Sequence, residues 1–163
     1  MNAANAELMI RFAQVADVPR ILEFIRQLAE YERLAHEAVA SEADLSAALF
    51  GPDAVAEVLV ADLDGEPCGF ALFFKSFSTF LGKPGLYLED LFVVPESRGM
   101  GVGTALLREL AKLVLQRGYG RLEWAVLDWN APAIKVYERI GAEPMSEWTV
   151  NRLSGDALRR LAD

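Results

Sequence analysis

The sequence predicts an α/β domain built around a β-sheet with strands in both directions. Three observations lead to this fold class: apolar runs typical of strands, apolar residues at three- and four-residue spacing typical of helices, and the order of the two along the chain, βααβββαβαβα. The chain has 163 residues, 53% of them hydrophobic, which is the size of one globular domain with one core. We therefore expect residues 1–163 to form a single domain.

The first strand and the first helix follow directly from residue patterns. Residues 8–12 alternate apolar and polar side chains, as a half-buried strand does. Asp17 then stands at the N-cap position of a helix whose first turn tolerates Pro19. The apolar face expected for this helix consists of Val18, Ile21, Leu22, Ile25, Leu28 and Ala29.

A second helix and a hairpin are expected next. Ser41, followed three positions later by Asp44, is typical of a capping box and predicts the start of a short helix. The apolar residues 57–61 and 69–74 predict two strands. Asp64-Gly65 between them is typical of a tight turn, so we expect these strands to pair antiparallel.

The rest of the chain is expected to begin with a loop and then to alternate strands and helices. The loop, at 76–85, is rich in serine, glycine and proline. The elements that follow are a strand at 86–94, a helix at 105–116, a strand at 121–127, a helix at 131–140, a strand at 148–153 and a C-terminal helix after Ser154.

Composition and charge exclude several kinds of partner. The net charge of −8 disfavours nucleic acid, because phosphate contacts need clustered cations. The single histidine, His36, is expected to be solvated and the single cysteine, Cys68, to pack as a small hydrophobe, so we expect no metal site. The sequence shows neither an apolar run long enough to span a membrane nor the pattern of a signal peptide, so we expect a cytoplasmic protein without a membrane partner.

A glycine-rich turn between a strand and a helix predicts a site for a phosphate-bearing ligand. Gly99, Gly101 and Gly103 leave the backbone N–H groups at the helix start accessible to an anion. The helix dipole adds about half a positive charge at the same place. A turn whose glycines only pack closely against the strand is the alternative.

The spacing of the glycines separates three kinds of phosphate site. A P-loop needs Lys-Ser/Thr after its last glycine, but Thr104-Ala105 follow Gly103. A dinucleotide fingerprint needs G-x-G-x-x-G at the first strand, whereas this turn reads G-x-G-x-G and comes late in the chain. What remains is Arg-x-x-Gly-x-Gly, in which the guanidinium of Arg98 would add a cation to the backbone donors.

Together with three other segments, this turn resembles the GCN5-related N-acetyltransferase (GNAT) superfamily, and the resemblance covers nearly the whole chain. The segments are 87–93 (YLEDLFV), 98–103 (RGMGVG), 128–132 (DWNAP) and 137–142 (YERIGA). They are similar to the branch of diamine (spermidine/spermine) acetyltransferases, which includes enzymes that act on thialysine. The resemblance implies the GNAT fold, with a splayed pair of central strands and flanking helices, acetyl-CoA as co-substrate, and a homodimer.

The resemblance also implies catalytic roles. A cationic amine must lose a proton before it attacks, and the departing thiolate benefits from gaining one. Tyr137 is similar to the family's tyrosine beside the thioester sulfur, which implies a proton donor; an aromatic that packs its helix on the sheet is the alternative. Glu89 is the implied proton acceptor, through water. Because Asp90 is its neighbour on one strand, we expect the two side chains on opposite faces.

Binding residues are implied in the same way. The amine would meet Tyr31, Glu32, Glu89 and Asp90; residues 33–37 are less acidic than in the polyamine enzymes, which makes a shorter amine or a lysine analogue at least as suitable as spermidine. Asn130 would bind the cofactor or simply cap a helix. The residues implied in cofactor binding are Leu91, Phe92, Val93, Arg98, Gly99, Met100, Gly101, Val102, Gly103, Thr104, Asn130 and Tyr137.

Two alternatives to small-amine acetylation stay open. The same fold also serves as a non-catalytic acyl-CoA sensor, although the presence of both Tyr137 and Glu89 argues against this. A protein lysine is the other candidate acceptor, since an acidic cleft would suit it as well.

Overall fold

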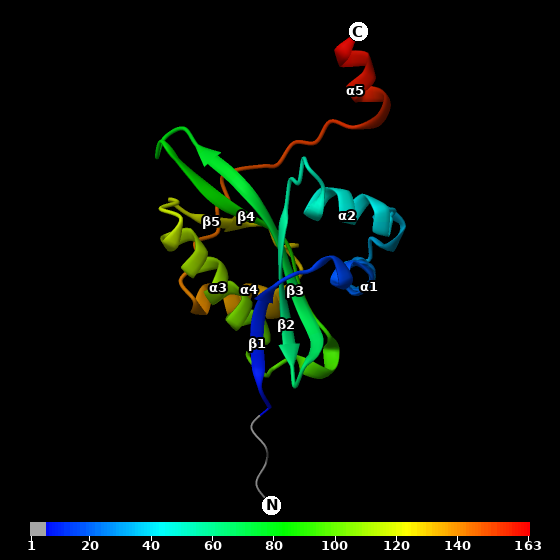
Figure 1. Cartoon of the computed structure of the whole chain (residues 1–163). Coiled ribbons are helices and arrows are strands. Elements are labelled where there is room, and N and C mark those ends of the chain that lie inside the picture. The colour runs from blue at the N-terminus through cyan, green and yellow to red at the C-terminus, as the bar shows by residue number, and fades with distance from the viewer. Residues whose placement is uncertain (1–5) are drawn as a thin grey trace, which may run out of the picture. The chain divides into compact units, whose positions relative to one another are not determined.

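The computed structural model describes residues 6–163, whose helices and strands are labelled in Figure 1. These residues form two compact units. The first unit ends at Leu127 and contains a five-stranded sheet with three α-helices; the second, Asp128–Asp163, contains two α-helices. In chain order the elements are β1 (Leu8–Phe12), α1 (Val18–Tyr31), α2 (Glu42–Phe50), β2 (Glu57–Leu63), β3 (Glu66–Ser78), β4 (Lys83–Val93), α3 (Val102–Gln116), β5 (Leu122–Trp124), α4 (Ala131–Arg139) and α5 (Gly155–Ala162).

The sheet is mixed, as predicted. Its strands lie in the order β1-β2-β3-β4-β5; the first four pair antiparallel, and β5 pairs with β4 in parallel. The parallel pairing covers Leu86 to Leu88 and ends there, whereas β4 continues to Val93. The two strands therefore separate along the second half of β4, which is the splayed arrangement that the resemblance implied.

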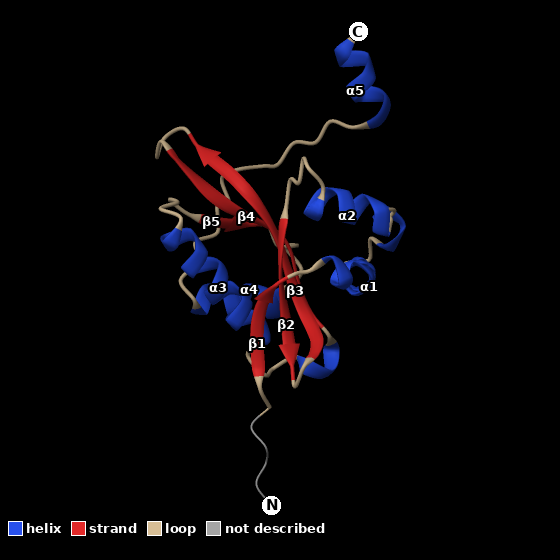
Figure 2. Ribbon diagram, in the orientation of Figure 1, coloured by secondary structure: helices blue, strands red, loops and turns tan. Residues whose placement is uncertain are grey.

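Helices cover both faces of this sheet, and the core of the first unit lies between the layers (Figure 2). On the face covered by α1 and α2, Phe24 is fully buried and stacks on Phe70 of β3 with ring centroids 5.7 Å apart. On the face covered by α3, Leu106 and Leu110 are fully buried. Burial of these side chains from both sides stabilises the layered arrangement.

The buried face of α1 differs in part from the predicted one. Ile21 and Leu22 are buried as expected, but Ile25 and Leu28 are only half-buried. Phe24, which the three- and four-residue spacing did not select, has no exposed surface. Its ring reaches the aromatic side chains of β3 and β4, so this large side chain decides how the helix faces the sheet.

Two local signals are confirmed. The hydroxyl of Ser41 accepts a hydrogen bond from the N–H of Asp44 at 3.2 Å, and the carboxylate of Asp44 accepts one from the N–H of Ser41 at 2.8 Å. This is the predicted capping box of α2. The β2–β3 hairpin turns at Asp64 and Gly65, whose φ angles of 52° and 84° lie in the left-handed region.

The β3–β4 hairpin is longer than predicted. Most of the loop expected at 76–85 consists of the two strand arms, which pair as far as Ser78 opposite Lys83. Gly85 is therefore a strand residue rather than a turn residue. A Cβ at Gly85 would lie 2.9 Å from the carbonyl oxygen of Arg121, so glycine permits close approach of two chain segments here.

Of the two strands predicted near the C-terminus, one is shorter than expected and the other does not form. The strand expected at 121–127 is reduced to Leu122–Trp124, because its neighbour β4 is paired with it only over that length. Residues 148–153 form no strand, although Trp148 and Val150 alternate with polar residues. A strand needs a hydrogen-bonded neighbour, and Asp128–Asp163, described in full, supplies none.

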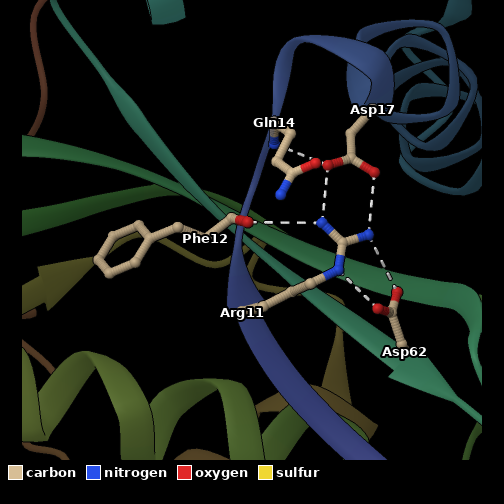
Figure 3. Close-up of polar contacts among 5 residues, drawn as sticks. All are labelled: Arg11, Phe12, Gln14, Asp17 and Asp62. Carbon is tan, nitrogen blue, oxygen red and sulfur yellow. Dashed lines mark hydrogen bonds and ion pairs between the residues drawn. The ribbon is translucent and has the colours of Figure 1, made fainter.

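An arginine with two carboxylates ties β1 to β2 and to the start of α1 (Figure 3). The two terminal nitrogens of Arg11 donate to Asp17 at 2.7 and 2.9 Å, and its Nε donates to Asp62 at 2.6 Å. Asp17 stands at the helix start as predicted, but its side chain makes no cap hydrogen bond to α1. It binds Arg11 and the N–H of Gln14 instead, and the hydrogen bond from Arg11 lowers the pKa of Asp17.

Three expectations from composition can be compared with the structure. Cys68 is buried, and burial raises the pKa of its thiol, as befits a small packed side chain. His36 is exposed at the surface, as expected. Across residues 6–163, the helices lack the combination of length and apolar character that crossing a bilayer requires.

Candidate active site

The glycine-rich turn connects the end of β4 to α3, where the sequence placed it. Gly99 and Gly101 have φ angles of 77° and 81°, in the region that favours glycine. A Cβ built on either would meet no heavy atom within 4 Å, so packing does not require glycine at these two positions. At Gly103 a Cβ would lie 3.9 Å from a methyl of Val93, an ordinary contact. The first two glycines therefore shape the backbone and leave the space beside it open.

The first turn of α3 presents backbone donors at this place. Gly101 is the N-cap, and its carbonyl accepts the hydrogen bond from the N–H of Ala105 at 2.9 Å. The N–H groups of residues 102–104 precede that bond, so the helix itself offers them no partner, and they lie at the positive end of its dipole. Such a helix start suits an anion the size of a phosphate group. The side chain of Met100 is exposed, that of Val102 is buried and that of Thr104 is half-buried.

Arg98 lies just before the turn and is held on several sides. Its Nε donates to the carbonyl oxygen of Val93 at 3.0 Å. Its guanidinium carbon lies 5.2 Å from the ring centroid of Tyr31 and 5.6 Å from that of Phe92. Among residues 6–163 no carboxylate forms an ion pair with Arg98. The positive charge is thus fixed in place without being neutralised by a carboxylate.

The stretch that the resemblance linked to the pantetheine arm lies beyond the last β4–β5 pair. Leu91, Phe92 and Val93 pair with β3 on one side only. Phe92 is buried against Phe24 of α1, with ring centroids 5.9 Å apart, whereas Leu91 and Val93 are half-buried. The side chains therefore belong to the fold, and the backbone edge on the β5 side is what this stretch offers to a ligand.

Two acids act on a third, Asp90, at this end of the first unit. Burial, and then the negative charges of Glu89 and Glu32, raise the pKa of Asp90 to about 6. Burial also raises the pKa of Glu32, at the end of α1. The structure thus brings the predicted amine-side acids within electrostatic reach of one another. A bound cation would relieve their mutual repulsion.

A β-bulge changes how the two adjacent acids are placed. Leu72 of β3 pairs with Asp90, but the next residue of β3, Phe73, pairs with Leu88, so Glu89 is an extra residue in β4. Residues paired across strands share a face, so Asp90, two residues before Phe92, lies on the face that α1 covers. The expected placement of the two acids on opposite faces rested on strict alternation, which the bulge interrupts.

Tyr87 is a neighbour of this group that the sequence analysis did not select. It stacks on Phe74 with ring centroids 5.3 Å apart. Burial, followed by the charges of Glu89 and Glu123, raises the pKa of Tyr87. Its place in the same YLEDLFV segment, two residues before Glu89, was the signal that could have identified it.

The other two predicted residues lie in the second unit. Asn130 is the N-cap of α4, and its side-chain oxygen accepts a hydrogen bond from the N–H of Ala133 at 3.4 Å. Tyr137 lies on the same helix and is half-buried. The predicted proton donor and proton acceptor thus belong to different units. Over the described part of the chain, no group of three His, Cys, Asp or Glu side chains could hold a metal ion.

Comparison with known proteins gives a consistent result. Residues 21–142 match the Acetyltransferase (GNAT) family. Thialysine N-epsilon-acetyltransferase of Bos taurus is 40% identical over 96% of this chain and 98% of its own length. L-ornithine N5-acetyltransferase of Arabidopsis thaliana is 34% identical over 93% of this chain and 86% of its own. An integron cassette protein of V. cholerae has a similar structure, with a TM-score of 0.79 at 28% identity, over 95% of this chain and 97% of its own.

Proposed function

Because the chain belongs to the acetyltransferase (GNAT) family and is an acetyltransferase, we propose that it transfers acetyl from acetyl-CoA to a primary amine of a small cationic acceptor. The acceptor class is a diamine, a polyamine or a lysine analogue such as thialysine. Two similar proteins are named for thialysine and ornithine, each an amino acid with a side-chain amine. The two names support a small acceptor rather than a long polyamine.

One observation is the main support for a cationic amine as the acceptor. Asp90, with its pKa raised to about 6, lies in the field of Glu89 and Glu32 at the end of β4 that leads into the glycine-rich turn. A cationic amine that binds there gains from all three acids. The glycine-rich turn, which begins nine residues after Asp90 at Gly99, offers backbone N–H donors to an anion. Opposite charges on the two substrates would therefore meet opposite fields at one end of the first unit.

The proposed chemistry is direct transfer. The amine gives up a proton to Glu89, through a water molecule, and its nitrogen then attacks the thioester carbon of acetyl-CoA. As the C–N bond forms and the C–S bond breaks, the sulfur leaves as a thiolate, and Tyr137 supplies the proton that turns it into a thiol. The nitrogen loses its second proton as it becomes the amide, and this proton restores the phenol of Tyr137, while the first proton leaves Glu89 for solvent.

Cofactor binding is divided among backbone groups. In the proposal, the N–H groups of residues 99–104 and the guanidinium of Arg98 hold the diphosphate. The free backbone edge at 91–93 binds the pantetheine amides, in the manner of an added strand. Asn130 would bind from the second unit, in addition to its role as a helix cap.

A diamino acid suits the surroundings of Glu32 better than a long polyamine does. Arg33, directly after Glu32, has a φ of 62° and follows the C-cap of α1. A lysine analogue carries a carboxylate as well as its side-chain amine, and Arg33 is the nearest cation in sequence to the amine-side acids. Thialysine, lysine or ornithine is therefore a better proposed acceptor than spermidine.

Thiol release from acetyl-CoA tests the proposal. The acceptors are thialysine, ornithine, lysine, putrescine, spermidine and a histone-like peptide, with norleucine as a control that keeps the amino-acid part and lacks the side-chain amine. We expect release with a small amine and none with norleucine. Binding of acetyl-CoA without release on any acceptor would identify a sensor, and release on the peptide alone would identify a protein-lysine acetyltransferase.

We also propose that the chain forms a homodimer in the cytoplasm. Trp148 and Val150 are 76% and 84% exposed in a segment that alternates like a strand and has no neighbouring strand in its own unit. A second copy would supply that neighbour. Sedimentation equilibrium tests this: a monomer at high concentration would exclude the dimer. The cytoplasmic location rests on the sequence argument and stays a prediction.

A further inference from the structure

A row of aromatic rings links the core of the first unit to the glycine-rich turn. Phe24 of α1 lies against Phe92 of β4, and Phe92 in turn lies 5.6 Å from the guanidinium carbon of Arg98. The row ends at Tyr31, the last residue of α1, whose ring centroid lies 5.2 Å from the same guanidinium carbon. Arg98 is thus the point where α1, β4 and the turn meet.

The two rings constrain Arg98 differently. Phe92 is buried and held by its neighbours, so its ring is a fixed surface. Tyr31 is 39% exposed and lies at a helix end, so its ring covers the guanidinium from the solvent side. Between them, the single hydrogen bond from Nε to Val93 fixes the base of the group. The two terminal nitrogens remain the part of the group that can donate to an anion.

We propose that Tyr31 is a positioning residue for acetyl-CoA, acting through Arg98, and not only a residue of the amine side as the resemblance implied. By covering the guanidinium, the ring restricts the long arginine side chain to the orientation in which its terminal nitrogens serve the diphosphate at residues 99–104. The inference rests on the proposed function. It adds that the end of α1, which carries Glu32 for the amine, also prepares the site for the cofactor.

The inference predicts a rank order of affinities for acetyl-CoA. Tyr31→Phe keeps the ring and should bind as the wild type does. Tyr31→Trp provides a better surface for a cation and should bind at least as tightly. Tyr31→Leu removes the ring and should raise the Kd roughly two- to fivefold, the size of one exposed cation–π contact. Phe80→Leu, which removes a ring that is 98% exposed on the β3–β4 turn, is the matched control and should leave the Kd unchanged.

A double-mutant cycle shows whether the effect passes through Arg98. Isothermal titration calorimetry gives the Kd of acetyl-CoA for the wild type, Tyr31→Leu, Arg98→Ala and the double variant, and thermal unfolding confirms that each is folded. If Tyr31 acts through Arg98, Tyr31→Leu has no further effect once Arg98 is alanine. A purely structural role for Tyr31 would weaken binding equally in both backgrounds and would overturn the inference.

The other outcomes are also decisive. An unchanged Kd for Tyr31→Leu, or equal weakening by Tyr31→Phe, overturns the inference while the proposed function stands. If Tyr31→Leu does not fold, the Kd values of the Phe and Trp variants for acetyl-CoA decide. A higher Kd for the Trp variant than for the Phe variant would contradict the role of the ring. Failure of the wild type itself to bind acetyl-CoA would instead refute the proposed function.

Discussion

Arg11 and Arg98 occupy two regions of the first unit and show two uses of the same side chain. Arg11 donates to two carboxylates, Asp17 and Asp62, so its charge is neutralised within the fold. Arg98 is held by one carbonyl and two rings, none of which carries a negative charge. The difference suggests that Arg11 stabilises the junction of β1, β2 and α1, whereas Arg98 is kept in place for an anion that comes from outside.

The carboxylates of the two regions differ in the same way. Asp17 accepts hydrogen bonds from a guanidinium, which lowers its pKa. Asp90 is buried near two other acids, which raises its pKa to about 6. The junction therefore pairs opposite charges, whereas the candidate site collects like charges that only a ligand would balance. Repulsion between like charges of this kind is common at binding sites.

The largest effect is expected from Arg11→Leu. It leaves Asp62, whose side chain is 6% exposed, without its cation, and such a loss costs about 3–5 kcal/mol of unfolding free energy. Because the folded pKa of Asp17 is lowered, its contribution is present above about pH 4 and is lost as the pH falls through the folded value. Urea unfolding at pH 7 and pH 3 measures this, and an equal loss at both pH values would contradict the ion-pair account.

Asp90→Asn is expected to stabilise the protein at high pH. The folded pKa of Asp90, about 6, lies above its ordinary value of 3.8, so the favourable contribution of the carboxyl is present below pH 3.8 and is lost as the pH rises through 6. At pH 8 the variant should be more stable than the wild type by about 3 kcal/mol, and near pH 4 the two should be alike. Asp17→Asn, the control from the junction, should lower stability at pH 8. A gain for Asp90→Asn that does not change with pH would argue against this reading.

Arg98→Leu should have the opposite profile to Arg11→Leu. We expect the Kd for acetyl-CoA to rise roughly 10- to 100-fold, which corresponds to the loss of charge-assisted hydrogen bonds worth about 1.5–3 kcal/mol. The unfolding free energy should fall by about 1 kcal/mol, the size of one hydrogen bond or one exposed cation–π contact, and so by less than in Arg11→Leu. Calorimetric titration and urea unfolding of the two leucine variants test the contrast. If Arg98→Leu lost stability and kept its affinity, the two arginines would not differ as described.

The smallest effect is expected from alanine at Gly101. Alanine at Gly118 is the control that separates the cost of backbone strain from a loss of ligand binding. Gly101 and Gly118 lie at opposite ends of α3 with φ angles of 81° and 68°, and a Cβ on either would meet nothing within 4 Å. Alanine at either position should therefore cost about 1–2 kcal/mol of stability. Only Gly101→Ala should also weaken acetyl-CoA binding, as calorimetry would show. Equal affinities for both variants would remove the turn from the proposed site.

The sequence predicted the structure well where the interacting residues are neighbours in the chain. The capping box of Ser41 and Asp44, the turn at Asp64-Gly65 and the glycine-rich turn before α3 all depend on groups a few residues apart. The splayed strand pair was also expected, although from resemblance to a family rather than from local pattern.

The predictions that failed depend on partners in other elements of the structure. The side chain of Asp17 accepts hydrogen bonds from Arg11, which also donates to Asp62 on β2. Asp17 therefore does not cap its helix. The strand expected at 148–153 has no neighbour in its unit. The contact of Arg98 with Tyr31 joins the turn to a distant helix, which no spacing rule reveals. The catalytic role of Tyr137 stays a prediction.

The bulge in β4 has a consequence for how freely this strand can change. From Lys83 to Val93, every residue except Glu89 has a partner on β3. If Glu89 were deleted, the other residues of β4 could keep the same partners on β3. Each of their side chains would stay on the same face of the sheet. Strand pairing alone therefore does not account for Glu89; as an extra residue it bends β4 and increases its twist just beyond Leu88, where the pairing with β5 ends.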